Sequence, residues 1–185
     1  MKFLLTTFLI IFFIGAFAQT PNLPIDSITN LITYTEVVKA DSNQAELYSR
    51  AREWFAKAYK SSTNVIQMDD KENGKIIGKA LMQVYFHSLG SDHESGYINY
   101  TILVYLKDKR YKYEINNFYH TGQYNTDGNR VPDFGTCEEM LREKRKARQK
   151  TFNYFLKQMD ENIKALIVSM KESMAKKSSV TKDDF

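Results

Sequence analysis

Three histidines are the side chains best suited to chemistry in this 185-residue chain, namely His87, His93 and His120. His93 is flanked by Asp92 and Glu94, and imidazoles beside carboxylates can bind a catalytic metal or move a proton in hydrolysis. The spacing favours surface histidines, because no two of the three lie one helical turn apart as the ligands of a metal-binding helix do. A hydrolase or metal-dependent enzyme that uses His87, His93, His120 and their acidic neighbours is therefore an alternative interpretation.

Other catalytic signatures are missing from the sequence. It has no glycine-rich phosphate loop and no nucleophile-elbow motif, and Cys137 is its only cysteine. The sequence therefore predicts no cofactor, no metal site and no internal disulfide. A buried, unreactive thiol is the favoured interpretation of Cys137.

A second group of residues suits binding better than catalysis. Aromatic rings and amides recur at alternate positions of segments that we expect to be strands. Such mixtures are typical of surfaces that bind sugars, peptides or another protein, and the alternative is that tyrosines simply suit exposed strands. The candidate ligand-binding residues are Tyr85, Tyr97, Asn99, Tyr105, Asn116, Phe118 and His120.

A predicted three-strand meander must position these residues. Alternate residues are apolar or aromatic in three runs, at residues 76–86, 98–106 and 111–115. This period of two is the pattern of strands that are buried on one face only. The second group of residues then falls on the opposite, open face.

A two-residue loop at residues 108–109 fixes the register that we expect for the last two strands, because it pairs Leu106 with Tyr111. Alternate residues of the first strand, from Lys79 to His87, join the same open face. The cross-strand pairs expected on that face are Tyr105 with Lys112, Leu103 with Glu114, Thr101 with Asn116, Asn99 with Phe118 and Tyr97 with His120.

Two helices are expected to cover the apolar face. Asp41, with Gln44 three residues later, predicts a capped helix start after a strand at residues 31–39. The apolar stripe of this first helix is Leu47, Ala51, Trp54, Phe55 and Ala58, and Arg50, Glu53, Lys57 and Lys60 lie off the stripe and should be solvated. A long amphipathic helix is predicted over residues 152–174.

The composition of the connecting segments predicts their structure. Residues 63–68 predict a short strand and residues 69–74 a turn, while residues 88–96 and 120–135 predict loops. Thr136 and Glu139 form a second capping box. Six of the nine residues from Arg142 to Lys150 are lysine or arginine, which indicates a solvated helix surface more than an anion-binding patch.

The first residues predict the destination of the protein. Residues 3–17 are almost wholly apolar after Lys2, and Ala16-Phe17-Ala18 is a small-x-small cleavage pattern before Gln19. This is typical of a secretory signal peptide. We therefore expect a signal peptide at residues 1–18, an extended leader at 19–30, one α+β domain at 31–176 and a polar tail at 177–185. No cysteine lies near the cleavage point, so a periplasmic or secreted protein without a lipid anchor or stable membrane insertion is expected.

This order of elements resembles a family of exported bacterial proteins, the domain of unknown function 4468, which has a TATA-binding-protein-like fold. The resemblance rests on the threonine-rich first strand leading to Trp54-Phe55, the strand at residues 74–86, and Tyr100-Thr101-Ile102 followed by Tyr111-Lys112-Tyr113. It implies a curved antiparallel sheet of about five strands with two helices on one face, in the order β-α-β-β-β-β-α. It also implies a Gram-negative envelope or secreted location, and it implies no activity.

Three interpretations of function follow. The favoured one is an exported, non-catalytic binding or interaction module that uses the open face, with a small molecule, a glycan, a peptide or an envelope protein as partner. The others are the histidine-based enzyme above and a purely structural envelope component. The fold could suggest DNA binding, but a fold alone does not imply function. The formal net charge is +4, and 25 − 22 = +3 once Lys2 is removed with the signal peptide. This mild charge, export and the absence of a minor-groove wedge pattern argue against nucleic acid as partner.

Overall fold

The computed structural model describes residues 21–88, 90–124 and 128–176. The predicted signal peptide with its cleavage point, the first two residues of the leader and the polar tail at 177–185 lie outside the described residues. The elements run β1 (Tyr34–Lys39), α1 (Gln44–Ala58), α2 (Ser62–Val65), β2 (Ile66–Asp70), β3 (Lys75–Ser88), β4 (Ser91–Lys107), β5 (Arg110–Thr121), β6 (Gly135–Thr136), α3 (Cys137–Leu141) and α4 (Lys146–Ala175).

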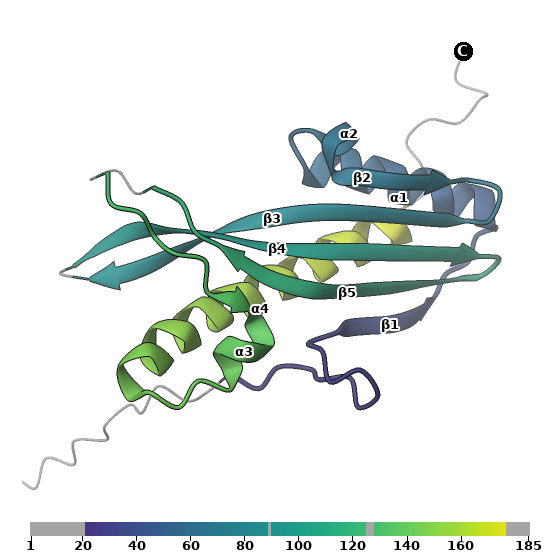
Figure 1. Ribbon diagram of the computed structural model, residues 1–185. Helices are drawn as coiled ribbons and strands as arrows, with labels where there is room; N and C mark the ends of the chain where they lie inside the picture. The colour runs from purple at the N-terminus through teal and green to yellow at the C-terminus, as the bar shows by residue number, and fades with distance from the viewer. Residues whose placement is uncertain (1–20, 89, 125–127, 177–185) are drawn as a thin grey trace, which may run out of the picture.

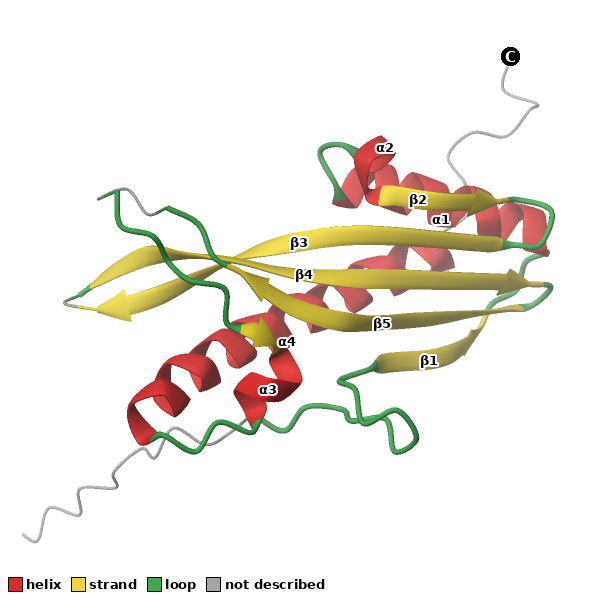
Figure 2. Cartoon of the chain, viewed as in Figure 1, coloured by secondary structure: helices red, strands yellow, loops and turns green. Residues whose placement is uncertain are grey.

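The predicted α+β class is confirmed. Five strands form an antiparallel sheet in the order β1-β5-β4-β3-β2, and the two-residue β6 adds to β5 beyond the end of β1. The long helices α1 and α4 both lie behind the sheet, while the opposite face looks out of the page (Figure 1). β3, β4 and β5 are long, whereas β1 and β2 are short edge strands (Figure 2). Among the described residues, no helix is long and apolar enough to cross a membrane.

The core lies between the sheet and the two long helices. Alternate residues of β4 and β5 are buried, and Ile102 and Ile115 among them are completely buried. Trp54 and Phe55 of α1 and Ile163 of α4 are buried against them with 1% exposure or less. Each such side chain contributes about 1.5–3 kcal/mol by leaving water, so the alternation in the strands and the stripes on the helices explain why these layers associate.

The helix α1 begins two residues later than the sequence predicts. Asn43, not Asp41, is its N-cap, and the Asn43 side chain accepts a hydrogen bond from the Glu46 backbone N–H at 2.9 Å. The chain before it is held by the β4–β5 turn, because Lys109 donates its N–H to the Ser42 carbonyl at 2.8 Å. Helical geometry can therefore start only after Ser42.

Two connecting segments also differ from prediction. Residues 62–65 form the single helical turn α2 before β2 begins at Ile66. The polar segment at residues 88–96 belongs to a hairpin, because β3 and β4 stay paired up to Ser88 and Ser91. This end of the hairpin contains exposed residues on both faces, such as Phe86 and His87, so it lacks the alternation that identifies a half-buried strand.

The segment after β6 largely agrees with the predictions made from the sequence. Thr136 and Glu139 form the predicted capping box at the start of α3. The only cysteine, Cys137, is completely buried, and its burial raises the pKa of its thiol; the predicted buried thiol is confirmed. Most side chains of residues 142–150 are exposed, and Glu143 pairs with Arg145 at 2.6 Å. The helix α4 begins at Lys146, six residues before the predicted start at Phe152.

Candidate functional site

The candidate site is the face of the sheet that α1 and α4 leave uncovered. Its central row comes from β4, where alternate residues are half-buried while the residues between them are buried. Flanking strands add exposed apolar side chains, with Leu81 on β3 at 55% exposure and Val37 on β1 at 59%. The half-buried row consists of Tyr97, Asn99, Thr101, Leu103 and Tyr105.

The predicted β4–β5 register is right in the half next to the turn. Leu106 lies opposite Tyr111 and Tyr105 opposite Lys112, and the same register continues to Thr101 and Asn116. Beyond that point the predicted register is wrong, because it shifts by one residue. The shifted pairs are Asn99 with Tyr119, Ile98 with His120 and Tyr97 with Thr121.

The cause is a β-bulge in β5. Asn117 has φ +57, a left-handed conformation that asparagine tolerates better than most residues, and it is the extra residue between two paired stretches. One extra residue turns every later side chain of β5 to the other face. Tyr119 thereby takes the open face at 42% exposure. The doublet Asn116-Asn117 was the signal in the sequence that could have indicated this.

Phe118 and His120 are therefore not part of the open face, contrary to the prediction. Phe118 is 1% exposed and His120 is completely buried. The Phe118 ring packs between Tyr34 and Tyr100, with ring centroids 5.9 and 6.1 Å away. Both residues belong to the core on the helix side.

The surroundings of His120 favour a neutral imidazole. Its Nε2 donates to the Ser95 carbonyl at 2.7 Å, and its Nδ1 accepts from the Phe134 backbone N–H at 3.3 Å. The ring stacks on Phe155 at 5.5 Å between centroids. Burial lowers the pKa of His120 below its ordinary value of 6.5, although the Ser95 contact opposes this shift.

The three histidines do not converge. His87 and His93 lie near the exposed end of the β3–β4 hairpin, where His87 Nδ1 is 2.9 Å from an Asp92 carboxylate oxygen. His93 lies opposite Phe86, one pair along the hairpin. Across residues 21–88, 90–124 and 128–176, no three histidine, cysteine, aspartate or glutamate side chains form a group able to hold a metal. In the part of the chain that the structure describes, His87, His93 and His120 therefore do not form one common site of the kind that the enzyme alternative requires.

The predicted aromatic platform is spread along the sheet. Tyr105 lies opposite Lys75, whereas Tyr85 lies ten residues farther along β3, about 33 Å away at 3.3 Å per residue. Tyr97 lies opposite Gln83, toward the Tyr85 end. No single small ligand could touch all the tyrosines, so the two ends must be considered separately.

At one end, Tyr105 is surrounded by basic side chains. The Lys75 ammonium lies 5.6 Å from the centre of the Tyr105 ring. A cavity of about 380 Å³ opens beside the ring, lined by Val37, Tyr105, Lys107, Arg110, Tyr111 and Lys112. Only the Lys112 ammonium among these has an ion-pair partner within the described residues, Glu114 at 3.2 Å.

In the middle of the face, the two predicted amides bind neighbouring groups. Asn99 donates to the Thr121 hydroxyl at 2.8 Å and to the Tyr119 carbonyl at 3.2 Å. Asn116 donates to the Glu114 carboxylate at 2.8 Å. The Asn116 side-chain oxygen is buried without a hydrogen-bond partner among the described residues. The side-chain N–H groups of both amides are therefore engaged within the sheet, and the buried Asn116 oxygen is not exposed to a ligand.

At the other end, Tyr85 is 37% exposed, and a helix side chain holds its backbone. Gln158 of α4 accepts from the Tyr85 N–H at 3.1 Å and donates to the Tyr85 carbonyl at 2.8 Å. Nothing in the local sequence predicts this contact, because the two residues are 73 positions apart.

Comparison with known proteins agrees with the fold. Residues 34–121 match the family model described as "Domain of unknown function (DUF4468) with TBP-like fold". A DUF4468 family protein from Bacteroides ovatus is similar in structure, with a TM-score of 0.61 at 16% identity over 85% of this chain and 94% of that chain. A TBP-like protein from Parabacteroides distasonis gives 0.58 at 12% identity over 80% and 97%. At these identities the likeness shows the fold alone. None of the curated proteins compared with the chain matches it.

Proposed function

We propose that this chain, which matches the DUF4468 family over residues 34–121, is an exported binding module whose ligand occupies the Tyr105 end of the open sheet face. The ligand carries an anionic group and an apolar part. The carrying observation is the cavity that places Tyr105 and Val37 beside Lys107, Arg110 and Lys112.

Charge complementarity supports an anionic ligand. Lys107 and Arg110 make no ion pair with the described residues, and both are exposed. A carboxylate or phosphate held between them gains charge-assisted hydrogen bonds, which are about twice as strong as neutral ones. The Tyr105 ring and Val37 offer the apolar surface that a ligand needs beside its charged group.

Export is the second part of the proposal. It is supported by the apolar run at residues 3–17 and by Ala16-Phe17-Ala18 before Gln19. An exported binding module would meet its ligand in the periplasm or the surrounding medium. Glycans, peptides and envelope proteins with acidic groups are the matching classes of ligand.

Ligand capture tests the proposal. The chain from Gln19 onward is immobilised, exposed to growth medium and to envelope extract, and the retained molecules are identified by mass spectrometry. We expect the unsubstituted chain to retain an anionic species, and the double variant Tyr105→Ser/Arg110→Ser to lose it.

The matched control is Tyr124→Ser, which removes a tyrosine that is 70% exposed on a loop away from the cavity. It should retain the same species as the unsubstituted chain. Retention of nothing, or equal retention by the double variant with an unchanged circular dichroism spectrum, would contradict the proposed site.

A further inference from the structure

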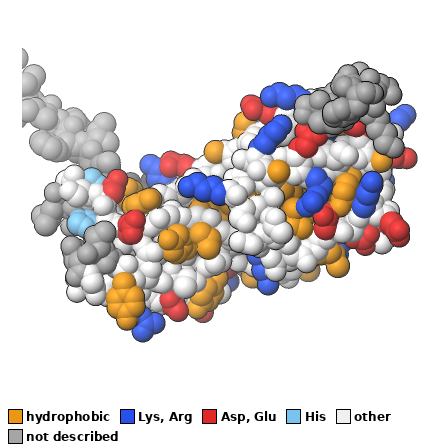
Figure 3. Space-filling model, turned by 90° about the horizontal axis from the view of Figure 1, so that it is seen from above, with side chains coloured by type: hydrophobic (Ala, Val, Ile, Leu, Met, Phe, Trp, Pro, Cys, Tyr) orange, Lys and Arg blue, Asp and Glu red, His pale blue; other side chains and the backbone are white. Residues whose placement is uncertain are grey.

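The edge of the sheet at β3 is only partly covered. β2 pairs with β3 from Lys75 to Gly78 and goes no farther. Beyond Gly78, β3 pairs with β4 on one side only. Figure 3 looks onto the side of the molecule where β2 and β3 lie, and shows separate hydrophobic patches with lysine or arginine side chains between them. The uncovered edge runs from Lys79 to Val84, because Gln158 binds the backbone of Tyr85.

The Gln158 contact identifies which backbone groups face outward. Gln158 binds both the N–H and the carbonyl of Tyr85 from outside the sheet. In an antiparallel strand, the backbone N–H and carbonyl of one residue point to the same edge of the strand, and those of the next residue point to the opposite edge. Lys79, Leu81 and Gln83 therefore also direct their N–H and carbonyl groups outward. Among the described residues, no hydrogen bond is made to these outward backbone groups.

The open stretch is closed at both ends. Ile66 of β2 lies opposite Gly78 at one end, and the Gln158 amide occupies the position of a neighbouring strand at the other. The space between corresponds to residues 79–84, about 20 Å at 3.3 Å per residue. The β3 strand of a second copy has 14 residues and would collide with β2. Only a short extended segment can lie there.

The walls of this space indicate the chemistry of that segment. A cavity of about 750 Å³ reaches from this edge to Asn117 of β5, and its lining includes Lys60, Lys79, Tyr59 and Leu81. Lys60 and Lys79 are exposed, and neither has an ion-pair partner among the described residues. No aspartate or glutamate lines this cavity. Leu81 is 55% exposed and offers an apolar contact.

We propose that the edge of β3 from Lys79 to Gln83 is a strand-addition site for a short, extended, acidic peptide segment of a partner protein. Main-chain hydrogen bonds to Lys79, Leu81 and Gln83 supply affinity, as in other cases of peptide addition to an exposed sheet edge. Acidic side chains of the peptide contact Lys60 and Lys79. This site is separate from the cavity beside Tyr105.

The probe is a fluorescein-labelled, blocked peptide in which pairs of valines alternate with pairs of glutamates, so that each face of the added strand carries both types; about seven residues are enough to span the open edge. Its counterpart has lysine in place of every glutamate. Fluorescence anisotropy with the chain from Gln19 onward should show binding of the acidic peptide and none of the basic one. Amide hydrogen exchange should slow at Lys79, Leu81 and Gln83 when the acidic peptide is added.

Two variants locate the site. Leu81→Pro removes an outward N–H, which an edge strand tolerates, and should weaken binding about tenfold or more. Lys60→Glu/Lys79→Glu should abolish binding of the acidic peptide without unfolding the chain. The matched control is Lys144→Glu, an exposed lysine on the segment before α4, which should bind like the unsubstituted chain.

Tyr105→Ser should also leave peptide binding unchanged, which separates this site from the proposed open-face site. Failure of the acidic peptide to bind, equal binding of the basic peptide, or no slowing of exchange at the three amides would overturn the proposal. Unchanged binding by the lysine double variant would also overturn it, and would indicate that Lys79 only protects the edge from aggregation.

Discussion

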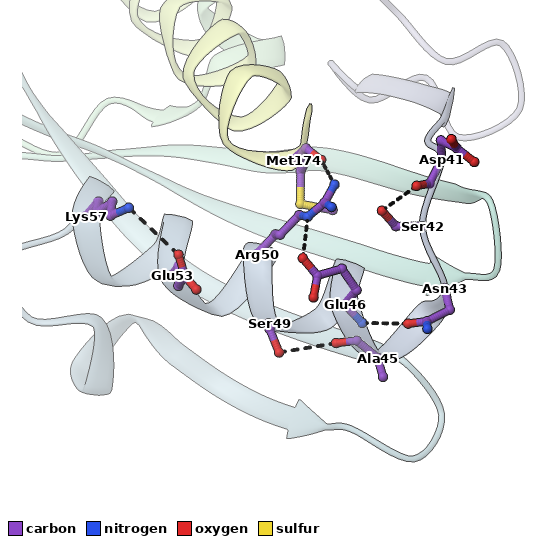
Figure 4. A network of polar contacts seen from close by, with 10 residues as sticks. All are labelled: Asp41, Ser42, Asn43, Ala45, Glu46, Ser49, Arg50, Glu53, Lys57 and Met174. Carbon is purple, nitrogen blue, oxygen red and sulfur yellow. Dashed lines mark hydrogen bonds and ion pairs between the residues drawn. The ribbon is translucent and has the colours of Figure 1, made fainter. Parts of the chain in front are cut away.

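The guanidinium of Arg50 on α1 donates a hydrogen bond of 2.8 Å to the backbone carbonyl of Met174 in the last turn of α4. Arg50 is 6% exposed, and its Nε also pairs with Glu46 at 3.0 Å. Figure 4 shows Arg50 between Glu46 and the end of α4. The prediction that Arg50 is solvated is therefore wrong, because α4 covers the face of α1 on which it lies. The cation satisfies a carbonyl that no intrahelical N–H can reach.

Arg50→Met should lower the free energy of unfolding by about 1.5–3 kcal/mol, the range for a lost hydrogen bond to a charged group. Methionine keeps much of the volume but leaves the Met174 carbonyl without its partner. Denaturant unfolding measures the change. Lys57→Met is the control. Lys57 is 71% exposed, and its ion pair with Glu53 is long, at 3.8 Å. This substitution should therefore lower the free energy of unfolding by less than about 0.5 kcal/mol. Equal losses would show that the Met174 contact does not stabilise the helix pair.

Ile163 and Leu166 should respond differently although both lie on α4. Ile163 is completely buried, and Ile163→Ala should cost about 2–5 kcal/mol. Leu166 is only half-buried, so Leu166→Ala should cost less. Thermal melting of both variants gives the comparison. If Leu166→Ala destabilises the protein as much as Ile163→Ala, the packing of α4 on the sheet differs from that described.

Phe118→Ser and Tyr105→Ser should separate the two faces of the sheet. Phe118 is buried between Tyr34 and Tyr100, so Phe118→Ser should cost about 3–5 kcal/mol, the range for truncating a buried aromatic side chain. Tyr105 is half-buried on the open face, so Tyr105→Ser should change stability much less. Chemical unfolding measures the loss of stability in each variant. A larger loss for Tyr105→Ser than for Phe118→Ser would show that the register shift does not lie at Asn117.

His120 should make the protein less stable on the acidic side of neutrality. Its pKa in the folded protein is lowered from 6.5 by burial, so the unfolded chain binds a proton at higher pH than the folded one. Stability then rises with pH; the contribution of the neutral ring is complete above the unfolded pKa and falls as the pH drops below it. Unfolding curves between about pH 5 and pH 7.5 cover this window. His120→Gln should show a smaller slope, and an unchanged slope would exclude His120 as its source.

Export predicts a defined N-terminus. When the full chain is expressed in a Gram-negative host, the protein recovered from the periplasm or medium should begin at Gln19, because signal peptidase cleaves after small-x-small patterns such as Ala16-Phe17-Ala18. Intact-mass analysis measures this, with allowance for cyclisation of Gln19. Ala18→Arg should block processing. A recovered protein that still contains residues 8–13 would contradict the prediction.

The sequence by itself determined the features that depend on neighbours in the chain. The alternation from Ile98 to Leu106 gave β4 its buried and open faces, and the short loop after Leu106 fixed the pairing with Tyr111. Thr136 and Glu139 capped α3 as predicted. These features follow from local periodicity and turn length, because side-chain direction in a strand and a capping box involve only residues a few positions apart.

The tertiary structure decided the features that depend on distant contacts. The bulge at Asn117 moved Phe118 and His120 into the core, where they pack on Tyr34 and Phe155. A shift of one residue in a strand turns all later side chains to the opposite face of the sheet. The apolar alternation before the bulge gives no sign that such a shift follows. The burial of Arg50 and the Gln158 contact likewise depend on where α4 lies against α1 and β3. That position is set by burying complementary apolar surfaces, and the pattern of either helix alone does not contain it.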